Sequence, residues 1–214
     1  MRMKTLVKII VSFYILLGLN SAFAQDTSLS FFITSKGSGD GANLGGLMGA
    51  DAICKSLATN VGQGNKNWKA YLSTQGMNSQ NAKDRIGAGP WYNSKGVMVA
   101  MNVADLHSDN NKLSKENSLD EHGMMINGRG DTPNKHDVIT GSNLDGTAFG
   151  ATSDMTCSNW TSNGEGSAMA GHHDRTGGGA NPTSWNAAHP TSGCSQANLI
   201  GTGGDGLFYC FASQ

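Results

Sequence analysis

The residues of this chain whose types suit a transition-metal ion lie in its last third, where His172-His173-Asp174 is followed by His189. Imidazole nitrogens and carboxylate oxygens together suit zinc and related ions. Adjacent histidines rarely share one ion, however, and no His-x-x-x-His pair on a helix supports them. We therefore expect these side chains to lie in a solvated, glycine-rich loop rather than in a metal site.

The second half of the chain also carries the mixture of groups that binds polar ligands such as sugars. Aromatic faces stack on a pyranose ring, while amides and carboxylates bond to its hydroxyl groups. Trp160 and Trp185 have a competing interpretation as core residues, and the segment 143–146 has one as a simple turn. The candidate ligand-binding residues are Asn143, Asp145, Asp174, Trp185, Asn186 and His189.

Catalytic motifs are not found in the sequence. It contains no Gly-x-Ser-x-Gly elbow, no His-Glu-x-x-His helix and no phosphate-binding loop, and its acidic residues are scattered. We therefore expect a protein that is not an enzyme. Arg129-Gly130-Asp131 spells an integrin-recognition tripeptide, for which chance is the better explanation in a chain with 30 glycines.

The charge of the chain argues against two classes of partner. Charged residues make up 14% of the sequence, the formal net charge is -1, and no basic run follows the first eight residues. Binding to nucleic acid or to an anionic membrane surface requires clustered positive charge. We expect neither partner.

The N-terminus predicts export, which decides how the cysteines are interpreted. Basic residues precede the apolar run 9–19, and Ala22-Phe23-Ala24 fits a signal-peptidase site, so residues 1–24 are predicted to be a signal peptide. The run is shorter than the roughly 20 residues of a membrane-spanning helix. In a secreted or periplasmic protein the 4 cysteines are expected to form two disulfides, and their spacing leaves all three pairings open.

Apolar periodicity predicts the elements that must position these residues. Leu47, Ala50, Cys54 and Leu57 recur at helical spacing. The segment 107–135 has too little periodicity for a core element, and so long a loop is usually functional or mobile. Residues 25–214 are expected to form a single domain. The other expected elements are strands at 29–34, 68–73, 97–101, 137–140 and 207–212, and a short helix at 81–86.

The order of several sequence blocks resembles that of a known superfamily. The blocks are GADAIC, WKAYLS, TGSNLDGT, TCSNWTS and LFYC. In this order they resemble the C-type-lectin-like superfamily, specifically a group of secreted bacterial proteins related to the endostatin-type domain of collagens, over residues 29–212. The resemblance implies an α+β fold with two short helices flanking a small antiparallel sheet, long loops and two nested disulfides, Cys54–Cys210 and Cys157–Cys194.

The resemblance also bears on ligands. Calcium-dependent lectins of this fold use Glu-Pro-Asn or Gln-Pro-Asp in the long loop and Trp-Asn-Asp in a neighbouring strand. This chain has neither loop triplet, and Ala187 follows Trp185-Asn186 where the acid should stand. No cofactor is therefore expected; the candidates for a calcium site are Asp145, Asp154, Asp174 and Asn186.

Together these features favour a secreted lectin-like binding module for a carbohydrate or another cell-surface or extracellular ligand, such as a surface protein. A secreted enzyme of unknown reaction, or a structural envelope protein, is the alternative.

Overall fold

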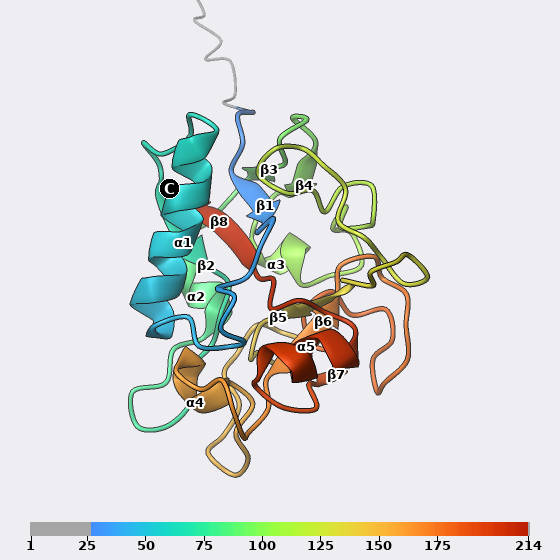
Figure 1. Ribbon diagram of the computed structural model, residues 1–214. Helices are drawn as coiled ribbons and strands as arrows, with labels where there is room; N and C mark the ends of the chain where they lie inside the picture. The colour runs from blue at the N-terminus through green and yellow to red at the C-terminus, as the bar shows by residue number, and fades with distance from the viewer. Residues whose placement is uncertain (1–26, 214) are drawn as a thin grey trace, which may run out of the picture.

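The computed structural model describes residues 27–213, so the predicted signal peptide lies outside the described residues. The chain is a mixed α/β protein in which short helices and small antiparallel sheets are joined by long loops (Figure 1). No helix within the described part is both long enough and apolar enough to cross a membrane.

The first sheet brings the two ends of the described chain together. Its strands are β1 (Phe31–Ile33), β8 (Tyr209–Ser213) and β2 (Asn67–Ala70), in the order β1-β8-β2. All pairs are antiparallel, and Cys210 of β8 lies opposite Phe32 on one side and Ala70 on the other. The predicted strands at 29–34, 68–73 and 207–212 are thereby confirmed, with shifted ends.

Helix α1 (Gly46–Asn60) packs along this sheet and confirms the predicted apolar stripe (Figure 1). Its small residues allow a close approach, since Ala50 and Ala58 are fully buried. Asp51 does not pair with Lys55 four residues later, as the helical spacing would allow. Its carboxylate instead pairs with Lys69 at 2.9 Å and Arg85 at 2.6 Å, which ties α1 to β2 and to the next helix.

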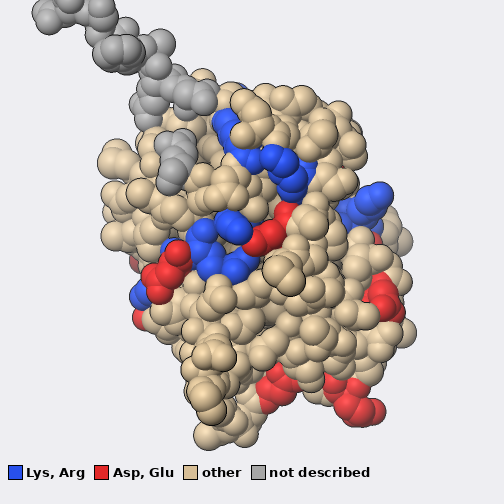
Figure 2. Space-filling model, turned by 90° about the vertical axis from the view of Figure 1, so that its left-hand side faces the viewer, with Lys and Arg blue, Asp and Glu red and all other residues tan. Residues whose placement is uncertain are grey.

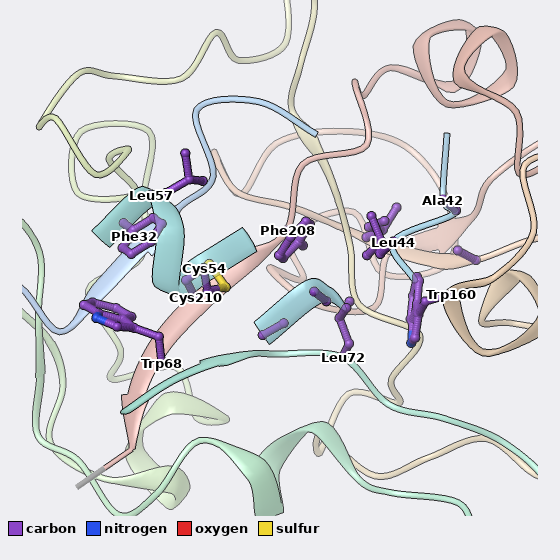
Figure 3. Close-up of a cluster of buried hydrophobic side chains, with 14 of the residues drawn as sticks. Phe32, Ala42, Leu44, Cys54, Leu57, Trp68, Leu72, Trp160, Phe208 and Cys210 are labelled. Carbon is purple, nitrogen blue, oxygen red and sulfur yellow. A yellow bond between two sulfur atoms is a disulfide. The ribbon is translucent and has the colours of Figure 1, made fainter. Parts of the chain in front are cut away.

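Both expected disulfides are present. Cys54 of α1 bonds Cys210 of β8, and Cys157 bonds Cys194. Figure 3 shows the first bridge among the side chains of Phe32, Trp68 and Phe208, inside the apolar cluster between α1 and the sheet. Two bridges fit a protein of an oxidising compartment.

The remaining elements are short. A hairpin joins β3 (Trp91–Tyr92) to β4 (Met98–Ala100) and forms the second sheet. The third sheet contains β5 (Asp137–Ile139), β6 (Met169–His172) and β7 (His189–Pro190), in that order. The other helices are α2 (Ala82–Arg85), α3 (Val103–Leu106), α4 (Cys157–Trp160) and α5 (Gln196–Thr202).

The expectation of two helices beside one sheet is thus too simple. Between residues 27 and 213 the chain has five helical segments and three sheets. The additional pieces are two to seven residues long, too short for apolar periodicity to reveal. In α4, four consecutive non-glycine residues have positive φ, from 47° at Cys157 to 69° at Trp160, a left-handed turn that the Cys157–Cys194 bridge anchors.

The face that carries α1 is not uniformly charged. Figure 2 shows lysine and arginine side chains next to acidic ones, with uncharged surface between them.

Candidate functional site

A polar cleft opens between two loop segments of the second half of the chain. Its volume is about 400 Å³, and its walls come from the segments 107–111 and 180–186, together with Leu144 and Arg175. Arg175 donates from Nη1 to Oδ1 of Asn111 at 3.0 Å and so ties the segment 107–111 to the turn that follows β6. Small-molecule sites typically have volumes of roughly 300–1,000 Å³. The cleft is therefore large enough for a small polar ligand.

Trp185 forms part of the cleft floor but belongs to the core. It is 3% exposed, its ring lies 4.8 Å from that of Tyr71, and its indole N–H donates to the carbonyl of Leu106 at 3.1 Å. A ring buried in this way has no free face for a ligand. The prediction of Trp185 as a stacking surface is therefore wrong, and its core interpretation holds; Trp160, which is fully buried, is also a core residue.

Asn186 is likewise buried, at 1% exposed, and acts within the protein. Its Nδ2 donates to the Tyr71 hydroxyl at 3.1 Å, and that hydroxyl bonds Nε2 of His107 at 2.7 Å. Nδ1 of His107 donates to the Val103 carbonyl, at 2.7 Å, so Nε2 is the acceptor. Burial lowers the pKa of His107, and it raises that of Tyr71. The chain of bonds runs from beneath the cleft to its wall at His107.

The acidic residues considered for calcium are held by local hydrogen bonds. Asp145 accepts from the backbone and hydroxyl of Thr147, which lowers its pKa. Asp154 accepts from the N–H groups of Thr156 and Ser158. Asn143 closes the same turn as Asp145 through its bonds to residues 147 and 148. The structure does not bring Asp145, Asp154 and Asp174 together as one ligand group.

A different set of side chains converges on the third sheet. Asp137 of β5 lies opposite His172 of β6, and Ala170 of β6 lies opposite His189 of β7. Residues 170 and 172 share one face of β6, so this register gathers Asp137, His172 and His189 on one side. His136 enters from the residue before β5, and its ring stacks on that of His172 with 4.4 Å between centroids. We call these four residues the histidine centre.

The histidine centre is compact and buried. Among the described residues, one group of three His, Cys, Asp or Glu side chains has ligand atoms within 4.8 Å of one another, and it is His136, Asp137 and His172. His189 joins it, with Nε2 at 3.0 Å from Nε2 of His172. His172 is completely buried and the His189 side chain is 23% exposed. The expected solvated loop is therefore wrong for His172.

His172 is the last residue of β6, and His173 is the turn residue that follows it. His173 is also buried, and its Nε2 lies 3.2 Å from the carbonyl of Asn127 in the long loop. Burial lowers the pKa of both rings. Only the first of the two adjacent histidines faces Asp137, which agrees with the expectation that neighbours rarely share one ion.

Asp174 supports the histidine centre from outside. Its Oδ1 lies 3.5 Å from Nδ1 of His136, and its Oδ2 accepts from the N–H of Arg129 at 2.6 Å. Burial alone would raise the pKa of Asp174, but the nearby His136 ring and hydrogen bonds from the backbone of Arg129 and Thr176 lower it well below its ordinary value. The nearby Asp137 carboxylate, 3.5 Å from Nε2 of His189, raises the pKa of His189 against the opposing effect of burial.

The tripeptide Arg129-Gly130-Asp131 lies on the exposed turn of the long loop next to Asp174. Arg129 and Gly130 are exposed, whereas the Asp131 carboxylate pairs with Lys115 and accepts from the N–H of Gly128 at 2.8 Å. The carboxylate is thus already engaged within the loop.

Sequence reasoning missed His136 and Asp137 at the histidine centre, and Asn111 and Arg175 at the cleft. The segment 134–140 did carry a signal, since a histidine directly precedes an apolar strand whose first residue is an aspartate. Their approach to His172 and His189 depends on the pairing of three strands, of which the first and the last are 50 or more positions apart in sequence. Local periodicity does not reveal that pairing.

The structure thus defines a disulfide-linked, mixed α/β protein with a polar cleft beside a buried histidine centre. A scan against protein-family models finds no match for the chain, and no curated protein matches it significantly.

Proposed function

We propose that this protein is an exported, C-type-lectin-like binding module that holds a polar ligand, such as a carbohydrate, in the cleft between residues 107–111 and 180–186. The resemblance of the sequence blocks motivates the fold. Two observations support it: β1 and β8 pair as neighbours, and Cys54–Cys210 ties the longest helix to the last strand. The ligand itself would be met in the periplasm or outside the cell.

The polar cleft carries the functional part of the proposal. Its walls offer hydroxyl, amide and guanidinium groups, including Asn111, Arg175 and Asn181. Loops on a rigid scaffold are where binding residues concentrate, and the Cys157–Cys194 bridge and the third sheet fix this scaffold. Trp185 and Asn186 act as the rigid floor, in place of the direct contacts expected for them. We propose binding without turnover.

A glycan-array screen of the purified protein tests the proposal, with a variant that fills the cleft. Thr183 is exposed on the cleft wall, so Thr183→Trp should block the cleft without changing the core. Ser56→Trp, on the exposed side of α1, is the matched control. We expect a glycan signal for the unmodified chain and Ser56→Trp, and its loss in Thr183→Trp. Equal binding by both variants would refute the cleft, and no glycan signal for the unmodified chain would refute the carbohydrate ligand.

A further inference from the structure

We propose that His136, Asp137, His172 and His189 bind one divalent transition-metal ion, with Zn²⁺ as the best fit. The proposal is independent of the ligand proposed for the cleft. It rests on the separations between the four side chains, on the unpartnered oxygens of Asp137, and on the direction in which two of the imidazole rings are held.

The separations match those of ligands around a small tetrahedral ion. Oδ1 of Asp137 lies 3.2 Å from Nε2 of His136, 3.4 Å from that of His172 and 3.5 Å from that of His189. Bonds of about 2.0–2.1 Å to a tetrahedral zinc ion put its ligand atoms about 3.3 Å apart. Direct hydrogen bonds between an imidazolium and a carboxylate are shorter, at about 2.7–2.9 Å.

Asp137 lacks the hydrogen bonds that a buried carboxylate usually accepts, although three imidazole rings lie near it. It is 2% exposed, and neither Oδ1 nor Oδ2 has a hydrogen-bond partner among the described residues. An isolated buried carboxylate is strongly destabilising unless it is paired or bound to a metal ion. A cation between Asp137 and the three rings would supply the missing partner.

The rings of His172 and His189 are oriented as metal ligands. Nδ1 of His172 lies 2.7 Å from the carbonyl oxygen of Pro182, and Nδ1 of His189 lies 3.1 Å from that of Pro190. A carbonyl only accepts, so each Nδ1 carries a proton, and either ring in its neutral form presents a lone pair at Nε2. These two Nε2 atoms face each other at 3.0 Å and cannot bond without a proton or a metal ion between them.

The surroundings complete such a site. Asp174 lies 3.5 Å from Nδ1 of His136, which gives the carboxylate–histidine arrangement that commonly orients metal-binding rings. Gly203 keeps space at the centre, because a Cβ there would lie 3.2 Å from Nε2 of His136 and 3.3 Å from Oδ2 of Asp137. The partly exposed side chain of His189 offers a route for the ion.

The donor set selects the class of ion. Three imidazole nitrogens and one carboxylate oxygen suit zinc and its first-row neighbours, whereas calcium requires six to eight oxygen ligands. A shared proton among the rings is the competing explanation. It would hold the same side chains without any affinity for zinc.

Isothermal titration calorimetry with Zn²⁺, on the full disulfide-bonded chain after treatment with a chelator, tests the proposal. We expect one zinc ion per chain, a parallel rise in melting temperature, and no comparable response to Ca²⁺. His189→Ala removes the ligand nearest the surface and should weaken zinc affinity at least about 100-fold, beyond the 10- to 100-fold typical of losing a supporting residue. His122→Ala is the matched control, since the His122 side chain is 55% exposed in the long loop.

A second variant distinguishes loss of the zinc site from loss of the fold. Asp137→Asn keeps the size of the side chain and removes its charge, and we expect a similar loss of zinc affinity. Circular dichroism of both variants without metal should match that of the unmodified chain. Failure of the unmodified chain to bind stoichiometric zinc would overturn the proposal and favour the shared proton. Unchanged affinity in folded His189→Ala and Asp137→Asn, or an equal loss in His122→Ala, would also overturn it.

Discussion

The first and third sheets are of similar size but have opposite interiors. The β1-β8-β2 sheet is covered by α1, is apolar, and is crossed by the Cys54–Cys210 bridge. The β5-β6-β7 sheet instead buries Asp137 and His172 in its strands, with His136 beside them. Apolar burial and a covalent bond stabilise the first sheet without any ligand. The third sheet buries polar atoms that have no hydrogen-bond partner among the described residues, and our zinc proposal accounts for them.

The largest expected effect is loss of the bridge in the first sheet. Cys54→Ala with Cys210→Ala opens a loop of sequence separation 156, whereas Cys157→Ala with Cys194→Ala opens one of 37. Chain entropy gives upper values of about 5 and about 4 kcal/mol for the lost free energy of unfolding. Denaturant unfolding of the two double variants measures both. A larger loss for the shorter loop would contradict the view that the first sheet holds the fold.

Trp185→Ala probes the floor shared by the core and the cleft. Because Trp185 is 3% exposed and bonds Leu106, we expect a loss of about 3–5 kcal/mol in the free energy of unfolding. Trp185→Phe keeps an aromatic ring and should lose less. If thermal or denaturant unfolding shows Trp185→Ala to be as stable as the unmodified chain, the ring is not the core residue described above.

Zinc should raise the free energy of unfolding by binding at the third sheet, whereas calcium should not. At a free zinc concentration one hundred times the dissociation constant, binding to the folded state alone adds about 2.7 kcal/mol to the free energy of unfolding. Calcium should change it little, because Asp145 and Asp154 are held by local hydrogen bonds. Melting curves with each ion decide this. A large rise with calcium and none with zinc would reverse the assignment and restore an oxygen-lined site.

The smallest expected effect concerns pH and His107 at the cleft wall. Burial lowers the pKa of His107, and the positive charge of Lys83 lowers it further. The hydrogen bond to the Val103 carbonyl and the negative charge of Asp145 raise it, but the net shift is downward. In the unfolded chain His107 has the ordinary histidine pKa of about 6.5. As the pH falls below that value, the unfolded chain binds more protons at His107 than the folded chain does, so the free energy of unfolding falls. His107→Gln keeps an acceptor for the Tyr71 hydroxyl but does not titrate. Its unfolding free energy should fall less between pH 7 and pH 5, and an identical fall would contradict this role.

Apolar patterning predicted the first sheet well and the third sheet poorly. The strand at 29–34 and the stripe on α1 are apolar at regular spacing, so their burial could be predicted locally. The disulfide pairing came from the resemblance, since spacing alone left three possibilities. Helix α5 was missed although Ser195 caps it by accepting from the N–H of Asn198, because the surrounding glycines indicate a loop.

The positions of the site residues could not be predicted from local sequence patterns. Trp185 and Asn186 have the composition of a sugar site, yet tertiary packing buries both beneath the cleft. His189 was expected among the ligand-binding residues and lies at the histidine centre, but its neighbours His136 and Asp137 are more than fifty positions away in sequence. Antiparallel register brings them together, and only the folded chain shows it.

The most direct test of the difference between the two sheets is a crystal structure of the zinc-loaded protein with anomalous diffraction recorded at the zinc edge. The account predicts one anomalous peak between β5 and β7, within about 2.0–2.2 Å of Nε2 of His136, His172 and His189 and of a carboxylate oxygen of Asp137. An anomalous peak only at an exposed side chain such as His122, with the four residues unchanged and no ion between them, would contradict it.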